Sequence, residues 1–534
     1  MGQMPHRLCR IVPTMSANGP AATVRLSELL AALSLGIDLG FGQPMEHVLR
    51  QCRIALRICG LMDVAESERP TVYYTALLVN VGCHTDAHEQ AHWFGDDIAL
   101  RASKYQSEPN SLADIATMLR LLGSGSTPLH RLRVALDFAV SGRRGIDTMI
   151  TGHARLARSL GEQLGLSAGV MDALAGSYER WDGKGFPGEL AGADIPLGSR
   201  IVQLAEFMEV AHRTGGERMA VEIAERRAGK QFDPTIVARF VADVEKVFHG
   251  IGEIGSWDAV IDDEPSLTAK LSPSEFEGAL TAIARFVDLK SPYTLGHSES
   301  VADLAGRAGE VTGMNADEAR QLRRAALVSG FGRLGLSNAI LDKRGALSAG
   351  EWERMRLQPH LTERILHQSG ALEHLSRIAV QIFERLDGSG YPRGLTGSSI
   401  SRSGRLLAVA NAYRAMLEPR PHRAALSADD AAAQLRTDVA AGRLDAAAVD
   451  AVLQVAGHRV DRRRGGGPAG LTEREVEVLC LLARGLTNKE IGARLMITPK
   501  TAGNHIEHIF VKIAATTRAE AGLFAMQHGL LVDP

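Results

Sequence analysis

The chain has 534 residues, a length that predicts three or four domains. Hydrophobic residues make up 45% and charged residues 23%, a normal globular balance that excludes a chain too polar to form cores. The 60 Lys and Arg nearly cancel the 62 Asp and Glu, so global charge neither supports nor excludes nucleic acid as a partner. Aromatic residues are only 5% while alanine and leucine are abundant, which favours helix.

The N-terminal residues 1–23 contain Pro, Gly and Ser without helical periodicity and are expected to form a flexible tail. They show no apolar stretch followed by a cleavage site. No apolar run approaches the roughly 20 residues that span a bilayer, so no membrane partner is expected. The cysteines are few and scattered, and their odd number fits a reducing cytoplasm. They are Cys9, Cys52, Cys59, Cys83 and Cys480.

The next two large blocks of the chain are related to each other. Trp181–Phe207 matches Leu386–Ala412 without gaps at an offset of 205, whereas Tyr73–Gly82 matches Arg323–Gly332 at an offset of 250. The change in offset places about 45 additional residues in the first block, near 85–145. This pattern predicts a tandem duplication with an insertion.

Both blocks are expected to be helical. The stretches ESVADLAGRAGEV (299–311) and HLTERILHQSGAL (360–372) carry apolar residues at i, i+3 and i+4. Between the blocks, residues 249–275 mix Gly, Pro and acidic residues without helical periodicity, so we expect a linker there.

The second block resembles HD-GYP domains, which are helical, metal-dependent cyclic-dinucleotide phosphodiesterases. The resemblance rests on GHSESV (296–301), AALVSGFGRLGLSNAIL (325–341), LSAGEWERMRLQPHLTERIL (347–366) and ERLDGSGYPRGLTG (384–397). The first block resembles the same family more weakly, mainly through Trp181–Phe207.

In the second block, most positions that hold metal ligands in the family carry other residues. His297 keeps the first histidine, but the remaining positions fall on Ser329, Gly330, Gln358, Ile382, Phe383 and Asn411. Ile and Phe side chains cannot coordinate a cation, and several imidazole and carboxylate ligands are needed to hold metal and activate water. We expect an inactive domain in which the loop Asp387–Pro392 persists because its glycines and proline shape a turn.

The first block departs from the family differently. Val79, Asn80, Ser177 and Tyr178 replace the His-Asp pair and the paired histidines. His47, His153 and Glu206 keep residues that could ligate one metal, and His88 and His92 lie four apart nearby. No cofactor is expected; a single divalent metal held by His47, His153 and Glu206 is the alternative.

The C-terminal residues 471–534 follow a basic, glycine-rich linker over 459–470 that includes Arg462–Arg464. Thr472 with Glu475 and Thr487 with Glu490 form capping boxes. Thr498 caps a third helix with Pro499 at its first position, and a fourth helix begins near Thr517. Ala502, Ile506, Ile509 and Ile513 mark the buried face of the third helix.

This unit resembles the LuxR-type helix-turn-helix DNA-binding domain from end to end, through LTEREVEVL, GLTNKEIGARL, PKTAGNHIEHIFVKI and TTRAEA. The helix-turn-helix places one helix in the major groove. The expected DNA-contacting residues are Thr487, Asn488, Lys489, Lys500, Thr501, Gly503, Asn504, Glu507 and Lys512. Asn504 is the candidate for base recognition, because its amide can pair with adenine.

We therefore expect an all-α, cytoplasmic homodimer. Its two inactive HD-like domains are expected to sense a small molecule or nucleotide, or to dimerise, and its LuxR-type domain is expected to bind double-stranded DNA. The alternatives are a metal-dependent phosphohydrolase fused to a DNA-binding domain, and a scaffold without ligand. The expected domains are 1–23 (tail), 24–248 (first HD-like domain, insertion near 85–145), 249–275 (linker), 276–458 (second HD-GYP-like domain), 459–470 (linker) and 471–534 (DNA-binding domain).

Overall fold

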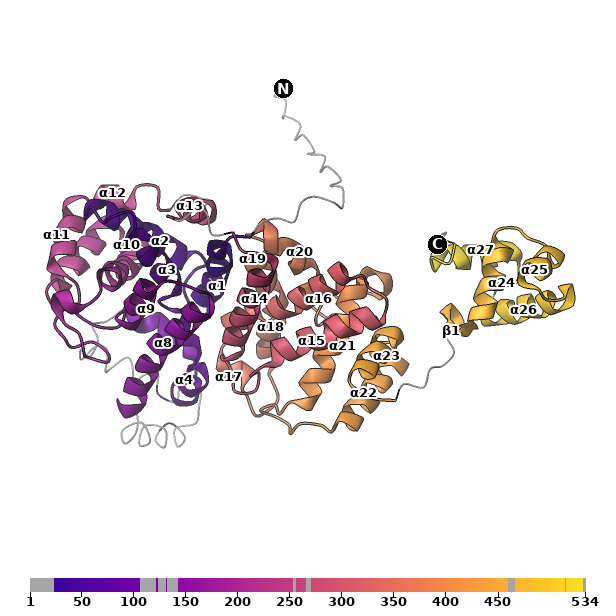
Figure 1. The fold of residues 1–534 in the computed structure, drawn as a ribbon. Coiled ribbons are helices and arrows are strands. Elements are labelled where there is room, and N and C mark those ends of the chain that lie inside the picture. Colours follow the sequence, from indigo (N-terminus) through magenta and orange to yellow (C-terminus); the bar gives the residue numbers. More distant parts are fainter. Residues whose placement is uncertain are drawn as a thin grey trace, which may run out of the picture. The chain divides into compact units, whose positions relative to one another are not determined.

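The structure is a computed structural model that describes residues 24–105, 122, 131, 143–252, 256–265, 270–459, 466–513 and 515–531. The regular secondary structure of the described residues is almost entirely helix, which confirms the all-α fold class (Figure 1). The chain forms two compact units, Met1–His458 and Arg459–Pro534. The predicted N-terminal tail, most of the insertion and Arg462–Arg464 lie outside the described residues.

The first copy of the duplication occupies the N-terminal part of the larger unit. Its elements are α1 (Leu26–Gly40), α2 (His47–Leu61), α3 (Arg69–Leu78), η1 (Val81–His84), α4 (Ala87–Phe94), α5 (Asp97–Ala102), η2 (Ser103–Tyr105), α8 (Arg143–Gln163), α9 (Ala168–Ala175), η4 (Gly192–Asp194), α10 (Leu197–Arg227), α11 (Pro234–Ala242) and α12 (Val244–Phe248). Helix α10 is interrupted at Gly215 and Gly216, the latter with φ of 72°.

The second copy follows with the same order of core elements. These are α14 (Pro273–Asp288), α15 (His297–Val311), α16 (Ala316–Val328), η5 (Phe331–Gly335), α17 (Asn338–Leu341), α18 (Ala349–Arg356), α19 (Gln358–Leu366), α20 (Gly370–Ala379), η6 (Gly397–Ser399), α21 (Arg402–Leu417), α22 (Ala428–Ala440) and α23 (Ala446–Val455). Its first helix begins at Pro273 behind a capping box of Ser272 and Glu275, three residues before the expected start of the domain.

The two offsets read from the sequence hold in the structure. Helices α2 and α15 both have 15 residues and begin at His47 and His297, 250 positions apart. The short turns η4 and η6 lie 205 positions apart at both ends. Each copy also brings the same two positions into backbone contact. A Cβ built on Gly82 would lie 2.4 Å from the His153 oxygen, and one on Gly332 would lie 2.0 Å from the Gln358 oxygen.

The segment between the copies differs from the linker expected there. Residues 256–262 form a helix, α13 (Ser256–Asp262), whose Val260 is fully buried. The Tyr73 hydroxyl donates a hydrogen bond to the Val260 oxygen. The apolar residues Trp257, Val260 and Ile261 recur at helical spacing over too few residues to stand out from the surrounding Gly and acidic residues.

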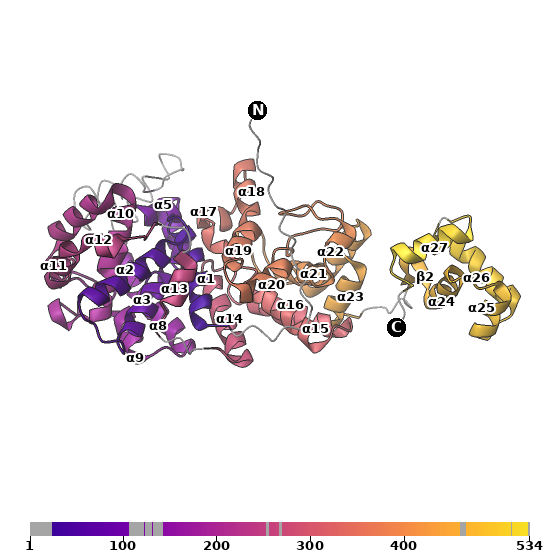
Figure 2. The same cartoon turned by 90° about the horizontal axis from the view of Figure 1, so that it is seen from above.

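The two copies pack against each other reciprocally within the larger unit. Helix α1 of the first copy contacts η5 and α19 of the second, and α14 of the second contacts α8 of the first. In Figure 2, α1 and α14 lie between the remaining helices of the two copies. Small residues allow this approach: a Cβ built on Gly36 would lie 2.8 Å from Leu334 Cδ1. His84 on η1 bonds the Phe286 oxygen at the end of α14.

The smaller unit has its own core around the helix-turn-helix. It contains β1 (Gly466–Gly467), η7 (Pro468–Gly470), β2 (Leu471–Thr472), α24 (Glu473–Ala483), α25 (Asn488–Leu495), α26 (Pro499–Lys512) and α27 (Arg518–Gln527). The capping boxes at Thr472 and Thr487 are present, and Thr498 caps α26 with Pro499 at its first position, as predicted. Thr517 caps α27.

Within the described ranges, every helix is too short or too polar to span a bilayer.

Candidate functional site

The predicted DNA-binding surface is formed by α25, a tight turn and α26. The turn contains Met496 in the left-handed region, with φ of 53°. It lies directly on α25, because a Cβ built on Gly492 would be 2.8 Å from the Ile497 oxygen. Ala502, Ile506 and Ile509 bury one face of α26 in the core of the unit, which leaves the opposite face free for a major groove.

Most of the predicted DNA-contacting residues are exposed on this surface. Asn488 and Gly503 are half-buried, and a Cβ built on Gly503 would lie 3.4 Å from Asn488 Nδ2. The exposed ones are Thr487, Lys489, Lys500, Thr501, Asn504, Glu507 and Lys512. Two of these residues take part in helix caps. Thr487 is the N-cap of α25, and the Thr501 hydroxyl bonds Thr498, the N-cap of α26.

Two further residues of this set make side-chain contacts within the domain. Lys512 Nζ donates to Glu475 Oε2 at 2.6 Å, which ties the end of α26 to the start of α24. Asn488 Oδ1 accepts from Arg518 Nη2 at 2.6 Å, and Arg518 Nη1 donates to the Leu486 oxygen. Arg518, which is not among the residues predicted from the sequence, therefore positions the start of α25.

In the second copy, the first and last aligned ligand positions meet. His297 Nε2 lies 3.0 Å from Asn411 Oδ1, and His297 Nδ1 lies 2.8 Å from Glu418 Oε2. Burial by itself would raise the pKa of Glu418, but the hydrogen bond and charge of His297 lower it below its ordinary value.

The other aligned positions of the second copy make protein contacts of their own. The Ser329 hydroxyl donates to the Ala326 oxygen, and Ile382 is buried. Phe383 stacks on Tyr391 of the glycine-rich loop, with ring centroids 4.9 Å apart. Gly330 lies next to Arg333, whose Nη1 donates to the buried Asp288 at 3.0 Å.

The glycine-rich loops of both copies are organised by a buried glutamate. Glu384 accepts the N–H groups of Arg393 and Leu395, and Glu179 accepts those of Gly188 to Leu190 in the first copy. The loop backbone also runs against the preceding segment: a Cβ on Gly390 would lie 2.5 Å from Glu384 Cα. These contacts give the loop a structural role that needs no metal.

In the first copy, the three residues of the candidate metal site each have a different partner. His47 Nδ1 bonds Glu209 at 2.5 Å, and His153 Nε2 bonds Asp86. Glu206 Oε1 accepts from Lys104 and Tyr105, two residues that sequence reasoning did not single out. Among the described residues, no group of three or more His, Cys, Asp or Glu could hold a metal ion.

The pKa values of His153 and of the neighbouring Cys83 are nevertheless both shifted. Burial would lower the pKa of His153, but the charge of Cys83 and the hydrogen bond with Asp86 outweigh it and raise that pKa to about 9. Burial would raise the pKa of Cys83, but the nearby His153 and Lys104 lower it below its ordinary value. Cys83 Sγ lies 3.1 Å from the Tyr178 hydroxyl. His88, the other histidine noted in this stretch, bonds Asp342 of the second copy instead.

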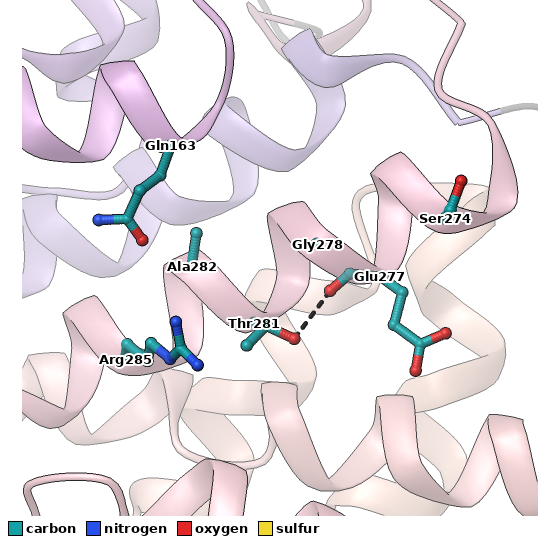
Figure 3. Close-up of a pocket in the computed structure, with 7 residues that line it drawn as sticks. All are labelled: Gln163, Ser274, Glu277, Gly278, Thr281, Ala282 and Arg285. Carbon is teal, nitrogen blue, oxygen red and sulfur yellow. Dashed lines mark hydrogen bonds between the residues drawn. The ribbon is translucent and has the colours of Figure 1, made fainter.

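Two of the surface pockets that the described residues line lie in the larger unit. One of about 620 Å³ is formed by the glycine-rich loop of the second copy together with α18 and α19, and includes Arg356, His360 and Tyr391. The other, about 490 Å³, has Gln163 of α8 facing Thr281 and Arg285 of α14 (Figure 3).

Comparison with known proteins shows which family this chain belongs to. The family described as "HD domain" matches residues 145–236 and 281–448. A 3'3'-cGAMP-specific phosphodiesterase 3 of Vibrio cholerae is 32% identical over 415 residues, which cover 77% of this chain and 90% of the relative. This chain belongs to the HD domain family.

A solved structure supports the HD family assignment. The crystal structure of the cyclic GMP-AMP phosphodiesterase V-cGAP3 of V. cholerae has a TM-score of 0.57 and 28% identity, and the match covers 82% of this chain and 99% of that one. The C-terminal unit of this HD family member matches "Bacterial regulatory proteins, luxR family" over residues 469–525. There it is similar to the transcriptional regulatory protein LiaR of Bacillus subtilis, with 42% identity over 83 residues, 15% of this chain and 39% of LiaR.

Proposed function

We propose that this chain is a sequence-specific DNA-binding transcriptional regulator whose two HD copies are non-catalytic and serve ligand sensing, dimerisation or both. The observation that carries the proposal is the exposed polar face of α26. Lys500, Thr501 and Asn504 are exposed, while Ala502, Ile506 and Ile509 hold the opposite face in the core. A helix presented in this way fits the major groove.

The residue types at the aligned ligand positions support the non-catalytic half of the proposal. A hydrolytic metal centre of this kind needs several carboxylate and imidazole ligands in fixed geometry. The second copy offers one imidazole, His297, with Ser, Gly, Gln, Ile, Phe and Asn at the other positions. Phe383 is stacked on Tyr391 and Ile382 is buried in the core. These residues do not fit a divalent metal.

DNA binding is tested by selection from random duplexes with the full chain. An enriched motif is expected, and Asn504→Ala should lower affinity for that motif by roughly 5- to 150-fold, or about 1–3 kcal/mol, because the amide no longer pairs with a base. Gln527→Ala, on the exposed surface of α27, is the matched control and should bind as the parent does. Failure to enrich any motif, or equal losses for both variants, contradicts the proposal.

A metal-dependent phosphodiesterase is the second candidate, favoured by the similarity to the 3'3'-cGAMP-specific relative. The purified full chain would then contain stoichiometric Mn or Fe and hydrolyse cyclic dinucleotides, and His47→Ala in the first copy would abolish turnover. The sensing proposal instead expects 3'3'-cGAMP, if it binds, to raise the melting temperature and remain intact. Chromatography of the nucleotide after incubation separates the two outcomes.

A homodimer fits the proposal because helix-turn-helix proteins commonly read two half-sites as symmetric dimers. Sedimentation of the full chain with and without the selected duplex tests it, with two chains per duplex as the expected result.

A further inference from the structure

A buried carboxylate in the first copy accepts three hydrogen bonds on one oxygen. Glu206, on α10, is 4% exposed. Its Oε1 accepts from Lys104 Nζ at 2.7 Å, from the Tyr105 hydroxyl at 2.8 Å and from Asn80 Nδ2 at 3.1 Å. A buried charge is costly unless it is paired and hydrogen-bonded, and the Lys104 ammonium supplies that pairing.

Aromatic rings surround the same ammonium group. Lys104 Nζ lies 5.4 Å from the centroid of Tyr105 and 5.9 Å from the centroids of Phe41, Tyr178 and Phe207. Ring faces attract an organic cation within about 6 Å, most strongly where water is excluded. They offer no lone pair to a divalent metal, which needs oxygen, nitrogen or sulfur ligands at about 2.0–2.2 Å. One carboxylate among four rings is therefore the chemistry of an alkylammonium site.

The site coincides with positions where the family carries metal ligands. Asn80, Tyr178 and Glu206 are three of the aligned ligand positions of the first copy. Glu206 and the Tyr178 ring lie against the Lys104 ammonium, and Asn80 donates to the same Glu206 oxygen. Lys104 and Tyr105 come from η2, in the insertion that the second copy lacks.

The second copy shows the complementary change. The counterpart of Glu206 is Asn411, a neutral amide that His297 contacts at 3.0 Å. The carboxylate therefore occurs in the copy that supplies an internal ammonium, and the amide occurs in the copy without the insertion. This pairing of charge with charge argues that Lys104 and Glu206 form one functional unit.

We infer that the first copy contains a binding pocket for a primary alkylammonium, formed by Glu206 and four aromatic rings at the former metal position, and that Lys104 of the same chain is its resident occupant. The insertion thus replaces a divalent cation with an organic one, and it does so intramolecularly.

The experiment uses the full chain with Lys104→Ala, which deletes the atoms of n-propylammonium. The variant should melt several degrees below the parent, because Glu206 loses its counter-charge. n-Propylammonium chloride at millimolar concentration should bind saturably in calorimetry and recover part of the melting temperature, whereas equal sodium chloride or n-propanol should not. Lys230→Ala, an exposed lysine outside the pocket, is the matched control and should show no propylammonium response.

Two results would overturn the inference. One is the absence of saturable propylammonium binding to Lys104→Ala; the other is stoichiometric Mn²⁺ binding by that variant, since it would show a metal site that Lys104 merely covers. If the alanine variant does not fold, Lys104→Met keeps the side-chain volume without the charge. The methionine variant should melt below the parent, and a variant as stable as the parent contradicts the ion pair.

Discussion

The two HD copies carry a buried aspartate at equivalent positions but accommodate its carboxyl group differently. Asp38 and Asp288, 250 residues apart, each accept the backbone N–H one residue beyond the first-motif histidine. Asp288 also pairs with Arg333, whereas the equivalent position in the first copy is Cys83. Burial raises the pKa of Asp38 to about 7, with the charge of His47 opposing the shift. One fold therefore tolerates either an ion pair or a carboxyl group that protonates near neutrality.

A second difference between the copies lies at the contact between them, where a residue of the insertion in the first copy binds groups of the second. Asp97 on α5 accepts from Ser337 Oγ and from the Asn338 N–H of the second copy, and from Arg101 of its own helix. Lys290 is fully buried with its ammonium 3.6 Å from Asp97. Burial lowers the pKa of Lys290 to about 8, although Asp97 opposes the shift. The first copy thus contributes the carboxylate on which buried groups of the second copy depend.

The largest effect should come from breaking this contact. Asp97→Ala leaves Arg101 and Lys290 buried without their shared counter-charge, and we expect the unfolding free energy of the larger unit to fall by about 3–5 kcal/mol. Denaturant titration of the full chain measures it. Glu310→Ala, an exposed acidic residue on α15, is the control and should change stability by less than about 0.5 kcal/mol. Equal effects of the two variants would show that the copies do not depend on Asp97.

Asp288 and Asp38, the aspartates at equivalent positions, should respond oppositely to substitution by asparagine at pH 8, when the change in unfolding free energy is compared. Asp288→Asn should destabilise by about 3 kcal/mol, because Arg333 loses its buried partner. Asp38→Asn should stabilise by about 2–4 kcal/mol, because a carboxyl group with a raised pKa resists ionisation in the folded state.

The raised pKa of Asp38 also makes the stability of the folded protein depend on pH. The unfolded carboxyl group ionises near its ordinary value of 3.8, so the folded protein loses stability as the pH rises from about 4 to about 7. The advantage of Asp38→Asn should therefore be larger at pH 8 than at pH 5 in paired denaturant titrations. A constant advantage would mean that Asp38 does not titrate in this range.

The glycine-rich loops, by contrast, should behave alike in both copies. A Cβ at Gly185 or Gly390 would lie within 2.6 Å of the backbone of Glu179 or Glu384, respectively. Alanine at either position should cost about 1–3 kcal/mol through overpacking. Thermal unfolding is the measurement, with Gly345→Ala, where no atom lies within 4 Å of a built Cβ, as the control. A large loss in only one copy would indicate a role beyond turn geometry.

The smallest effect concerns two lysines of the DNA-binding unit. Lys500 is exposed near the start of α26, whereas Lys512 already bonds Glu475. Lys500→Ala should therefore reduce the slope of log affinity against log salt by about 0.9, the value for one phosphate contact, and Lys512→Ala by less. Binding titrations at several salt concentrations measure both slopes. An equal reduction would show that DNA competes successfully with Glu475 for Lys512.

Local signals in the sequence were sufficient for the helix boundaries of the C-terminal unit. Thr472, Thr487 and Thr498 each cap the helix predicted for them, because a cap is decided within four residues. The repeat offsets located equivalent positions equally well, including His153 with Gln358. Helix α13 was missed because seven residues carry too little periodicity to be recognised among glycines.

The sequence by itself determined the helical fold, the duplication, the DNA-binding helices and which residue types stand at the aligned ligand positions. Only the tertiary structure decided what those positions contact. Lys104 meets Glu206 across 102 residues, and Asp97 meets Ser337 across 240. Neither pair has a local signal, since burial and partner choice depend on how helices distant in sequence pack together.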